Sequence, residues 1–291
     1  MLIIDKLIEK SKKLRAPVCV GLDPTVDLLP DHIISANGGN VPAAFLEFNI
    51  NIIDAVYDIV PAVKPQIAFY EQYGAEGFEV YTKTVAYAKS RGLIVIADVK
   101  RGDIGSTATA YAEGRLAADG ADFATVNPYL GKDSLKPFID VCKRDNKGIF
   151  VLVATSNPGG ADLQKLELVN GLKLYEHVGN MVSEIGGDLM GNYGYSSVCA
   201  VVGATKPEEA INLRRQLPSV FFLIPGYGAQ GGTAADVAVC FDAQGAGGIV
   251  NSSRGIIGAW KKTDKPEDYA QAARAAAVAM VKDLREYIGG L

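Results

Sequence analysis

Histidine is scarce in this sequence: only His32 and His177 occur among 291 residues. No HxH, HExxH or CxxC motif is present, and the common zinc sites depend on such spacings. We therefore expect no histidine-based zinc site and no metal. The cysteines are far apart and three of them lie in apolar runs, so we expect reduced thiols in the core, not metal ligands or disulfides. They are Cys19, Cys142, Cys199 and Cys240.

A long hydrophobic run is also missing. Although 48% of the residues are hydrophobic, no stretch of about 18 apolar residues occurs, so we expect no membrane span. Residues 1–10 have the spacing of an amphipathic helix but no positive n-region and no small-residue cleavage site. We therefore expect no secretory signal and a cytoplasmic protein. The formal net charge of −4 argues against a nucleic-acid-binding surface.

Short apolar segments alternate with helical patterns along the chain, as in residues 76–90 and 106–118. The candidate strands are residues 17–23, 62–68, 93–100, 122–127, 148–156, 197–205, 220–227 and 247–254. Such alternation is typical of parallel βα units. Eight units predict an α/β protein with one (β/α)₈ TIM-barrel domain over residues 1–291. An open doubly wound sheet is the alternative.

Two connections in the predicted barrel are long, and we treat both as insertions into one domain. Residues 31–61 contain a Gly-Gly-Asn turn followed by a helical pattern. Residues 157–196 are expected to contain a helix near residues 166–185. The alanine-rich segment 266–288 is predicted to be the last barrel helix.

The third predicted strand and the residues after it are the most informative segment. An apolar first half predicts a buried strand, which ends in Asp98 and Lys100, and Asp103 follows just beyond it. Asp98 and Lys100 are two residues apart, so they point to the same side of a regular strand. The neighbouring carboxylates would keep Lys100 protonated, and an oriented, charged lysine can deliver a proton. The alternative is a structural ion pair that closes the strand end.

Polar or glycine-rich residues also end the other predicted strands. They are Asp23, Lys64, Asn127, Ser156, Thr205, the loop 225–232, Ser253 and Arg254. Active sites of TIM barrels lie at the carboxyl ends of the strands. We therefore expect these side chains to surround an active site.

Residues 226–231 match the G-x-G-x-x-G pattern of dinucleotide-binding folds. They follow the seventh strand, however, and no acidic residue at the end of a following strand completes that pattern. In TIM barrels, the loops after strands seven and eight often form a phosphate site. We therefore expect the N–H groups of this loop and the Arg254 guanidinium to bind phosphate. The alternative is a tight turn beside a surface arginine.

With the D-x-K-x-x-D motif at Asp98, Lys100 and Asp103 and the predicted phosphate loop, the sequence resembles the orotidine 5′-phosphate decarboxylase family. The likeness covers nearly the whole chain and is greatest to the longer bacterial branch. The motif is shared with magnesium-dependent sugar-phosphate decarboxylases and aldolases of the same superfamily. Those relatives tend to carry an acidic residue at the second strand, where this chain has Lys64. Such an enzyme, or a catalytically silent nucleotide-phosphate-binding barrel, is the alternative.

The resemblance implies decarboxylation of orotidine 5′-monophosphate to uridine 5′-monophosphate and CO₂, the last step of de novo pyrimidine nucleotide biosynthesis, without a cofactor. The implied catalytic residues are Lys64, Asp98, Lys100 and Asp103. Lys100 would donate the proton, and Asp98 would lie against the substrate carboxylate.

The resemblance further implies a homodimer whose active sites are shared, with Asp103, Ile104 and Thr107 acting in the partner's site. Of the other implied substrate-binding residues, Asp23 and Lys64 would hold ribose hydroxyls, Ser156 the pyrimidine edge, and Gln230 and Arg254 the phosphate, with Pro225 beside them in the loop. Tyr227 departs from the family pattern, and whether it contacts phosphate or only packs stays open.

Overall fold

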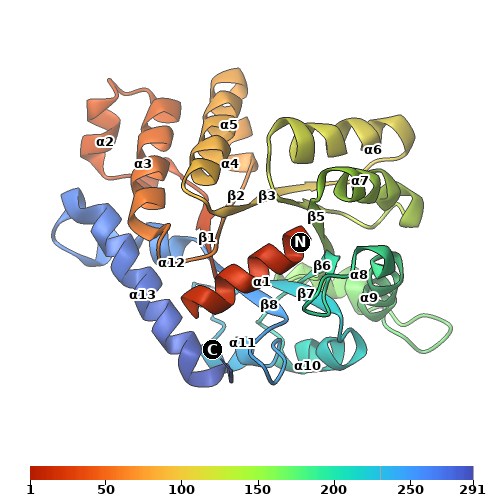
Figure 1. Cartoon of the computed structure of the whole chain (residues 1–291). Coiled ribbons are helices and arrows are strands. Elements are labelled where there is room, and N and C mark those ends of the chain that lie inside the picture. Colours follow the sequence, from red (N-terminus) through yellow and green to blue (C-terminus); the bar gives the residue numbers. More distant parts are fainter. Residues whose placement is uncertain (230, 291) are drawn as a thin grey trace.

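The fold is a closed barrel of eight parallel strands, seen in a computed structural model that describes residues 1–229 and 231–290 (Figure 1). The strands are β1 (Val18–Leu22), β2 (Ala62–Pro65), β3 (Ile94–Arg101), β4 (Phe123–Val126), β5 (Gly148–Ala154), β6 (Ser196–Val202), β7 (Val220–Ile224) and β8 (Gly248–Ser252). The barrel closes where β1 pairs with β8, with Val18 opposite Val250. The predicted TIM barrel is confirmed, and closure rules out the open sheet.

Helices surround this barrel (Figure 1). They are α1 (Ile3–Leu14), α2 (Asp31–Ala36), α3 (Val41–Val56), α4 (Ala68–Glu71), α5 (Gly74–Ser90), α6 (Gly105–Ala112), α7 (Lys132–Asp145), α8 (Ala161–Gln164), α9 (Leu174–Ile185), α10 (Pro207–Gln216), α11 (Ala234–Ala238), α12 (Arg254–Ile257) and α13 (Tyr269–Tyr287). The helices α2 and α3 lie in the first long connection, and α8 and α9 lie in the second.

Successive residues of a strand contribute alternately to two apolar layers, one between the barrel and the helices and one inside the barrel. On β1, Val18 and Val20 pack outward with the helices, whereas Cys19 belongs to the cluster inside the barrel. All four cysteines are buried and free. This alternation leaves the interior filled with side chains, so that a ligand can enter only beyond the strand ends.

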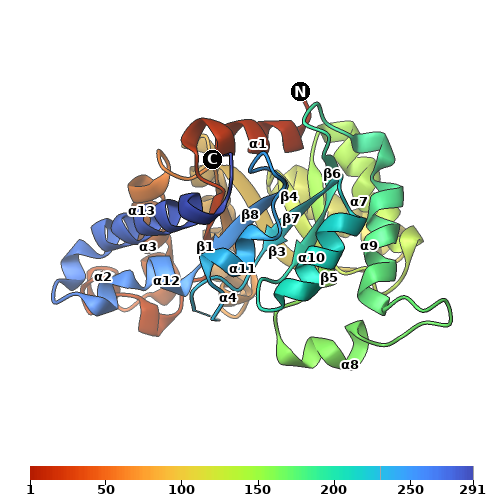
Figure 2. The ribbon, with the colours of Figure 1, turned by 90° about the horizontal axis from the view of Figure 1, so that it is seen from below.

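Helix α1 closes one end of the barrel. Its residues Ile4 and Leu7 are fully buried and share a cluster with Ala62 and Ile94, the first residues of β2 and β3. Figure 2 shows α1 across one end of the barrel and α8 at the opposite end. Because α1 covers the amino ends of the strands, the open end is the one where the strands finish.

The predicted helix over residues 166–185 is wrong in its first part. Residues 166–173 form a turn in which the Leu168 N–H donates to the Leu172 carbonyl at 2.8 Å, and α9 begins only at Leu174. Gly171 has φ +79°, a conformation that glycine adopts at no steric cost. The Asn170-Gly171 pair therefore favours a turn over a helix at this point.

The predicted second strand is too long, because β2 ends at Pro65 and α4 already begins at Ala68. Proline has no N–H to continue the ladder. Another predicted segment, residues 106–118, is helical throughout, but α6 gives way after Ala112 to a π-helical turn over Glu113–Ala118.

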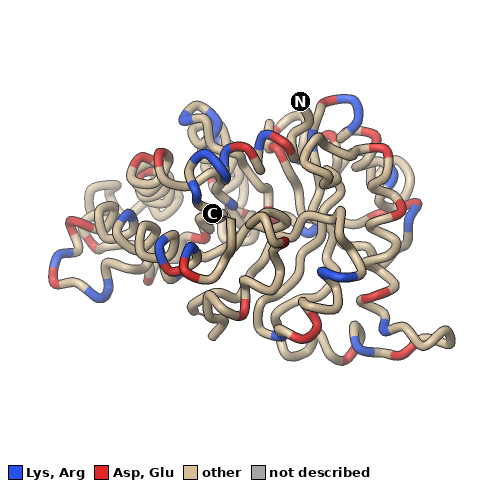
Figure 3. The backbone as a smooth tube through the Cα atoms, turned by 60° about the horizontal axis from the view of Figure 1, so that its bottom comes forward, with Lys and Arg blue, Asp and Glu red and all other residues tan. Residues whose placement is uncertain are grey.

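Charged residues are spread over the molecule. Lys and Arg are interspersed with Asp and Glu on many helices and loops (Figure 3). Within the described part of the chain, no helix combines the length and apolarity that a bilayer crossing requires.

Candidate active site

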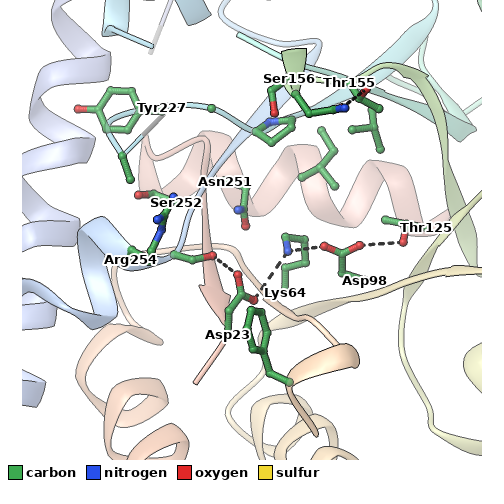
Figure 4. Close-up of a pocket in the computed structure, with 18 of the residues that line it drawn as sticks. Asp23, Lys64, Asp98, Thr125, Thr155, Ser156, Tyr227, Asn251, Ser252 and Arg254 are labelled. Atoms are coloured by element: carbon green, nitrogen blue, oxygen red, sulfur yellow. Dashed lines mark hydrogen bonds and ion pairs between the residues drawn. The ribbon is translucent and has the colours of Figure 1, made fainter. Parts of the chain in front are cut away.

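A cavity of about 830 Å³ opens at the carboxyl ends of the strands. Figure 4 shows that its lining comes from strands and loops around the whole barrel. Among the lining residues are Asp23, Lys64, Asp98, Lys100, Thr125, Thr155, Ser156, Pro225, Tyr227, Asn251, Ser252 and Arg254. The geometry therefore brings together most of the polar strand ends that the sequence singled out.

The Asp98 carboxylate lies at the centre of the charged groups. One oxygen, Oδ2, accepts a hydrogen bond from Lys64 Nζ at 2.6 Å. The other, Oδ1, accepts from Lys100 Nζ at 2.5 Å and from Thr125 Oγ1 at 3.0 Å. Lys64 Nζ also lies 4.0 Å from Asp23 Oδ1 (Figure 4). The ammonium groups of Lys64 and Lys100 thus bind the Asp98 carboxylate, and the Asp23 carboxylate lies close to Lys64.

Charge interactions outweigh burial at both buried partners. Burial favours a neutral Asp98, but Lys64 and Lys100 hold the pKa of its carboxyl well below the ordinary value. Burial likewise disfavours the charged form of Lys64, yet Asp23 and Asp98 raise its pKa above the ordinary value. Both groups therefore stay ionised at neutral pH.

Lys100 has an unusual backbone for a strand residue. Its φ is +44°, and β3 shifts register against β4 between Ala97 and Arg101. A non-glycine residue in such a region costs on the order of 1–3 kcal/mol and is often found at functional sites. Asp98 and Lys100 do meet on one side, as predicted, but the predicted reason is wrong, because a bulge and not regular alternation brings them together.

Two buried oxygens near the array have no hydrogen-bond partner among the described residues: Asp23 Oδ1 and Asn251 Oδ1. Asp23 is oriented through its other oxygen, which accepts from Ser253 Oγ at 2.5 Å. Unpaired buried acceptors are costly unless a ligand satisfies them. Both atoms belong to cavity-lining residues and are suited to accept from hydroxyl groups of a bound molecule.

The predicted phosphate loop lies over the same cavity. Pro225 and Tyr227 line it, and the loop is folded back by a hydrogen bond from the Gly232 N–H to the Gly226 carbonyl at 3.0 Å. Arg254 is exposed and its side chain makes no hydrogen bond or ion pair with any described residue, so its guanidinium is available to an anion. Gln230, predicted to join it, lies outside the described residues.

Comparison with known proteins decides the family. Residues 16–269 match the model of the Orotidine 5′-phosphate decarboxylase / HUMPS family. The chain belongs to this family. Orotidine 5′-phosphate decarboxylase of Clostridium perfringens (strain 13 / Type A) is 44% identical over 288 residues, covering 99% of both chains. That of Clostridium botulinum (strain Langeland / NCTC 10281 / Type F) is 46% identical over 286 residues, 98% of this chain and 99% of the relative.

Solved structures agree with the family assignment. The structure of Leishmania donovani OMP decarboxylase superposes with a TM-score of 0.75 at 32% identity, covering 97% of this chain and 99% of the other. The resemblance predicted from the D-x-K-x-x-D motif is confirmed.

Three residues with implied roles in the decarboxylase family lie outside this cavity. They are Asp103 and Ile104, between β3 and α6, and Thr107, within α6. Asp103 Oδ1 accepts from the Ile104 N–H at 2.8 Å, and the Ile104 side chain is 57% exposed. Within one chain, therefore, the fourth charge of the predicted array does not line the cavity with the other three.

The sequence analysis did not single out Thr125 or Asn251. Both are polar residues inside short apolar strands, Phe123–Val126 and Gly248–Ser252. Thr125 is the lone polar residue of a fully buried strand, so it must find a partner, and this signal could have identified it; Asn251 is partly buried and precedes the polar Ser252, so it carries no such signal.

No group of three or more His, Cys, Asp or Glu residues suited to a metal ion occurs among residues 1–229 and 231–290. In the cavity, the Lys64 ammonium lies between the two carboxylates that would otherwise be closest to such an ion.

Proposed function

We propose that this protein decarboxylates orotidine 5′-monophosphate to uridine 5′-monophosphate and CO₂, the last step of de novo pyrimidine nucleotide biosynthesis. The observation that carries the proposal is the pair of ammonium groups, Lys64 and Lys100, bound to the one Asp98 carboxylate in a cavity that also presents Arg254. Membership of the decarboxylase family supports it.

The reaction breaks the bond between C6 of the pyrimidine and its carboxylate. CO₂ leaves, the electron pair stays on C6, and Lys100 donates a proton from Nζ to that carbon. Asp98 holds the Lys100 ammonium in place before the reaction, so no solvent must reorganise as charge develops on the carbon. Preorganised charge of this kind is usually the largest contribution to catalysis.

The substrate carboxylate would lie against Asp98 and lose an unfavourable charge contact as neutral CO₂ departs. Asp23 and Lys64 would hold ribose hydroxyls, and the unpaired Asp23 Oδ1 supports this role. Ser156 lies on the cavity wall after β5 and would contact the pyrimidine edge.

The phosphate group would bind Arg254 and the loop that begins at Pro225, with Gln230 as a further donor. These contacts are remote from C6, so their binding energy accelerates the reaction only if it is realised in the transition state. Closure of the loop over the bound phosphate would couple phosphate binding to stabilisation of the transition state at C6. The Arg254 side chain, which has no hydrogen-bond or ion-pair partner among the described residues, is suited to that role.

The proposed reaction uses no metal and no organic cofactor. Support comes from Lys64, because a cation on Asp98 and Asp23 would compete with an ammonium that already lies 2.6 Å from Asp98. A cytoplasmic location and a single barrel domain over residues 1–291 belong to the same proposal. The four buried, free cysteines are consistent with a reducing compartment.

We also propose that two copies form a dimer with shared active sites, in which Asp103, Ile104 and Thr107 act in the partner's cavity. All three lie outside the cavity of their own chain. Large apolar side chains are exposed in the connection after β4, the neighbour of β3, among them Tyr129 at 75% and Leu130 at 48% exposure. Exposed apolar residues of this kind often mark an interface.

An ultraviolet assay of the purified protein with orotidine 5′-monophosphate, with and without EDTA, tests the proposal. We expect conversion to uridine 5′-monophosphate at the same rate in both. Activity that EDTA removes and Mg²⁺ restores would favour a magnesium-dependent relative instead. Binding of the nucleotide without any turnover would favour a silent binding barrel.

A further inference from the structure

The Thr125 hydroxyl uses its full hydrogen-bonding capacity on the residues of the charged array. Its oxygen accepts from the backbone N–H groups of Val99 and Lys100, both at 2.9 Å, and its O–H donates to Asp98 Oδ1 at 3.0 Å. A hydroxyl offers one donor and two acceptor sites. Thr125 is 1% exposed, so water does not compete for any of them.

These contacts explain how β3 keeps its irregular backbone. Between Ala97 and Arg101, β3 has two residues more than the paired segment of β4 from Ala124 to Val126. The extra length takes Val99 and Lys100 out of the regular ladder, and the Thr125 side chain supplies the acceptor for both of their N–H groups. Lys100 can therefore keep its φ of +44° without leaving either of these N–H groups unpaired.

The same hydroxyl also orients the carboxylate. Asp98 Oδ1 receives the Thr125 O–H and the Lys100 ammonium, while Oδ2 receives Lys64. Rotation of the carboxylate would break the Thr125 contact and move the acceptor of Lys100 at the same time. One hydroxyl thus links the backbone of Lys100 to the group that holds its side chain.

We propose that Thr125 is a positioning residue that fixes the Lys100 backbone and the Asp98 carboxylate in the geometry required for proton delivery to C6. This inference rests on the proposed decarboxylase function. Thr125 acts through Asp98 and Lys100, and the reacting carbon receives its proton from Lys100 alone.

Two substitutions at this position separate the hydroxyl from the volume of the side chain. Thr125→Val keeps the shape but leaves two N–H groups and one carboxylate site without their partner. Thr125→Ser restores the hydroxyl. Thr84→Val is the matched control, because Thr84 is also fully buried and its hydroxyl donates to the Val80 carbonyl at 2.8 Å on α5.

We expect Thr125→Val to lower kcat on the order of 100-fold, the usual result of misplacing a reacting group by about 1 Å. KM should change much less, since Asp23 and Arg254 are untouched. Thr125→Ser should recover most of kcat, and Thr84→Val should lose stability without losing kcat. A kcat for Thr125→Val within a few-fold of the unmodified enzyme, or a serine variant no better than the valine variant, would overturn the proposal.

A crystal structure of Thr125→Val tests the geometry independently of any activity. We expect φ of Lys100 to become negative or the contact between Lys100 Nζ and Asp98 Oδ1 to be lost. An unchanged backbone and an unchanged contact would overturn the positioning role even if the protein is a decarboxylase. If the unmodified protein does not decarboxylate its substrate, the proposed function fails, and the link of Thr125 to catalysis fails with it.

Discussion

Lys64 Nζ lies 2.6 Å from Asp98 Oδ2, and the two side chains are only 7% and 9% exposed. Burying two charges is favourable only where good geometry and further hydrogen bonds compensate for lost hydration. Here Lys100 and Thr125 supply those bonds on the Asp98 side, and Asp23 lies 4.0 Å from Lys64 on the other. The stability of the fold and the chemistry of the site therefore depend on the same contact.

Asp98→Asn should destabilise the protein by about 3 kcal/mol at neutral pH, because it leaves the buried Lys64 ammonium without its close partner. The pKa of Asp98 is depressed in the folded state, so its stabilising effect is present above the unfolded value of about 4 and is lost as the pH falls below it. Urea unfolding of the unmodified protein and of Asp98→Asn between pH 8 and pH 3 measures the difference in their unfolding free energies. A difference in unfolding free energy that stays constant down to pH 3 would contradict the ionised pair.

Lys100→Ala should lower kcat by roughly 10⁴-fold or more, because it removes both the proton donor and a fixed positive charge. Binding of uridine 5′-monophosphate, measured by calorimetry, should persist because the groups facing the phosphate and ribose remain. Lys83→Ala, which removes an exposed ammonium on α5, is the control and should leave kcat unchanged. Normal turnover by Lys100→Ala would refute the assignment of the donor.

Arg254→Ala should reduce kcat/KM about 100-fold, the effect of losing a contact worth about 3 kcal/mol to a charged group. Arg254→Lys should recover part of this, since an ammonium keeps the charge but not the bidentate geometry. Lys262→Ala removes a neighbouring exposed charge and controls for a general electrostatic effect. Steady-state kinetics on the full substrate would show an unchanged kcat/KM for Arg254→Ala if the phosphate lies elsewhere.

Most of the fold could be predicted from the sequence, because the spacing of the apolar residues and the local composition are enough to identify the strands and helices. Each of the eight predicted strands overlaps one observed strand of the barrel, since short β-branched runs between helical patterns leave few other arrangements. The errors fall at element ends, where local chemistry decides. Asn170-Gly171 turns the chain before α9, and Pro65 ends β2.

The site could be predicted only in part. Charged residues at strand ends stand out in the sequence, which is why Asp98, Lys64 and Lys100 were identified and do meet. The bulge in β3 and the role of Thr125 depend on the pairing register between β3 and β4. The residue spacing within one strand does not determine that register. The proposed place of Asp103 in a second copy's cavity depends on how two chains pack together, and the spacing of residues in one chain does not determine that packing.

Tyr227→Phe tests the link between the phosphate loop and the last helix. The Tyr227 hydroxyl donates to Asp283 Oδ2 at 2.6 Å, and this hydrogen bond anchors the ring to α13. Tyr227 also lines the cavity (Figure 4). Loss of the hydrogen bond should raise KM for the nucleotide a few-fold, because the loop is then less well anchored. Asp283→Ala removes the acceptor and should have the same effect if the hydroxyl only anchors the loop. If the hydroxyl contacts phosphate, kinetics would show a loss for Tyr227→Phe that Asp283→Ala does not share.

Mixing two inactive variants tests whether the active sites are shared. Lys100→Ala and Asp103→Ala each damage every site in their own homodimer. In a hybrid dimer, one site combines an intact Lys100 from one copy with an intact Asp103 from the other, so random subunit exchange should restore about a quarter of the normal activity. Dilution and reassociation before the assay provides the exchange, and fluorescence transfer between labelled copies verifies that it occurred. Exchange without any recovery of activity would show that Asp103 serves the site of its own chain, because a shared site cannot remain defective in the hybrid.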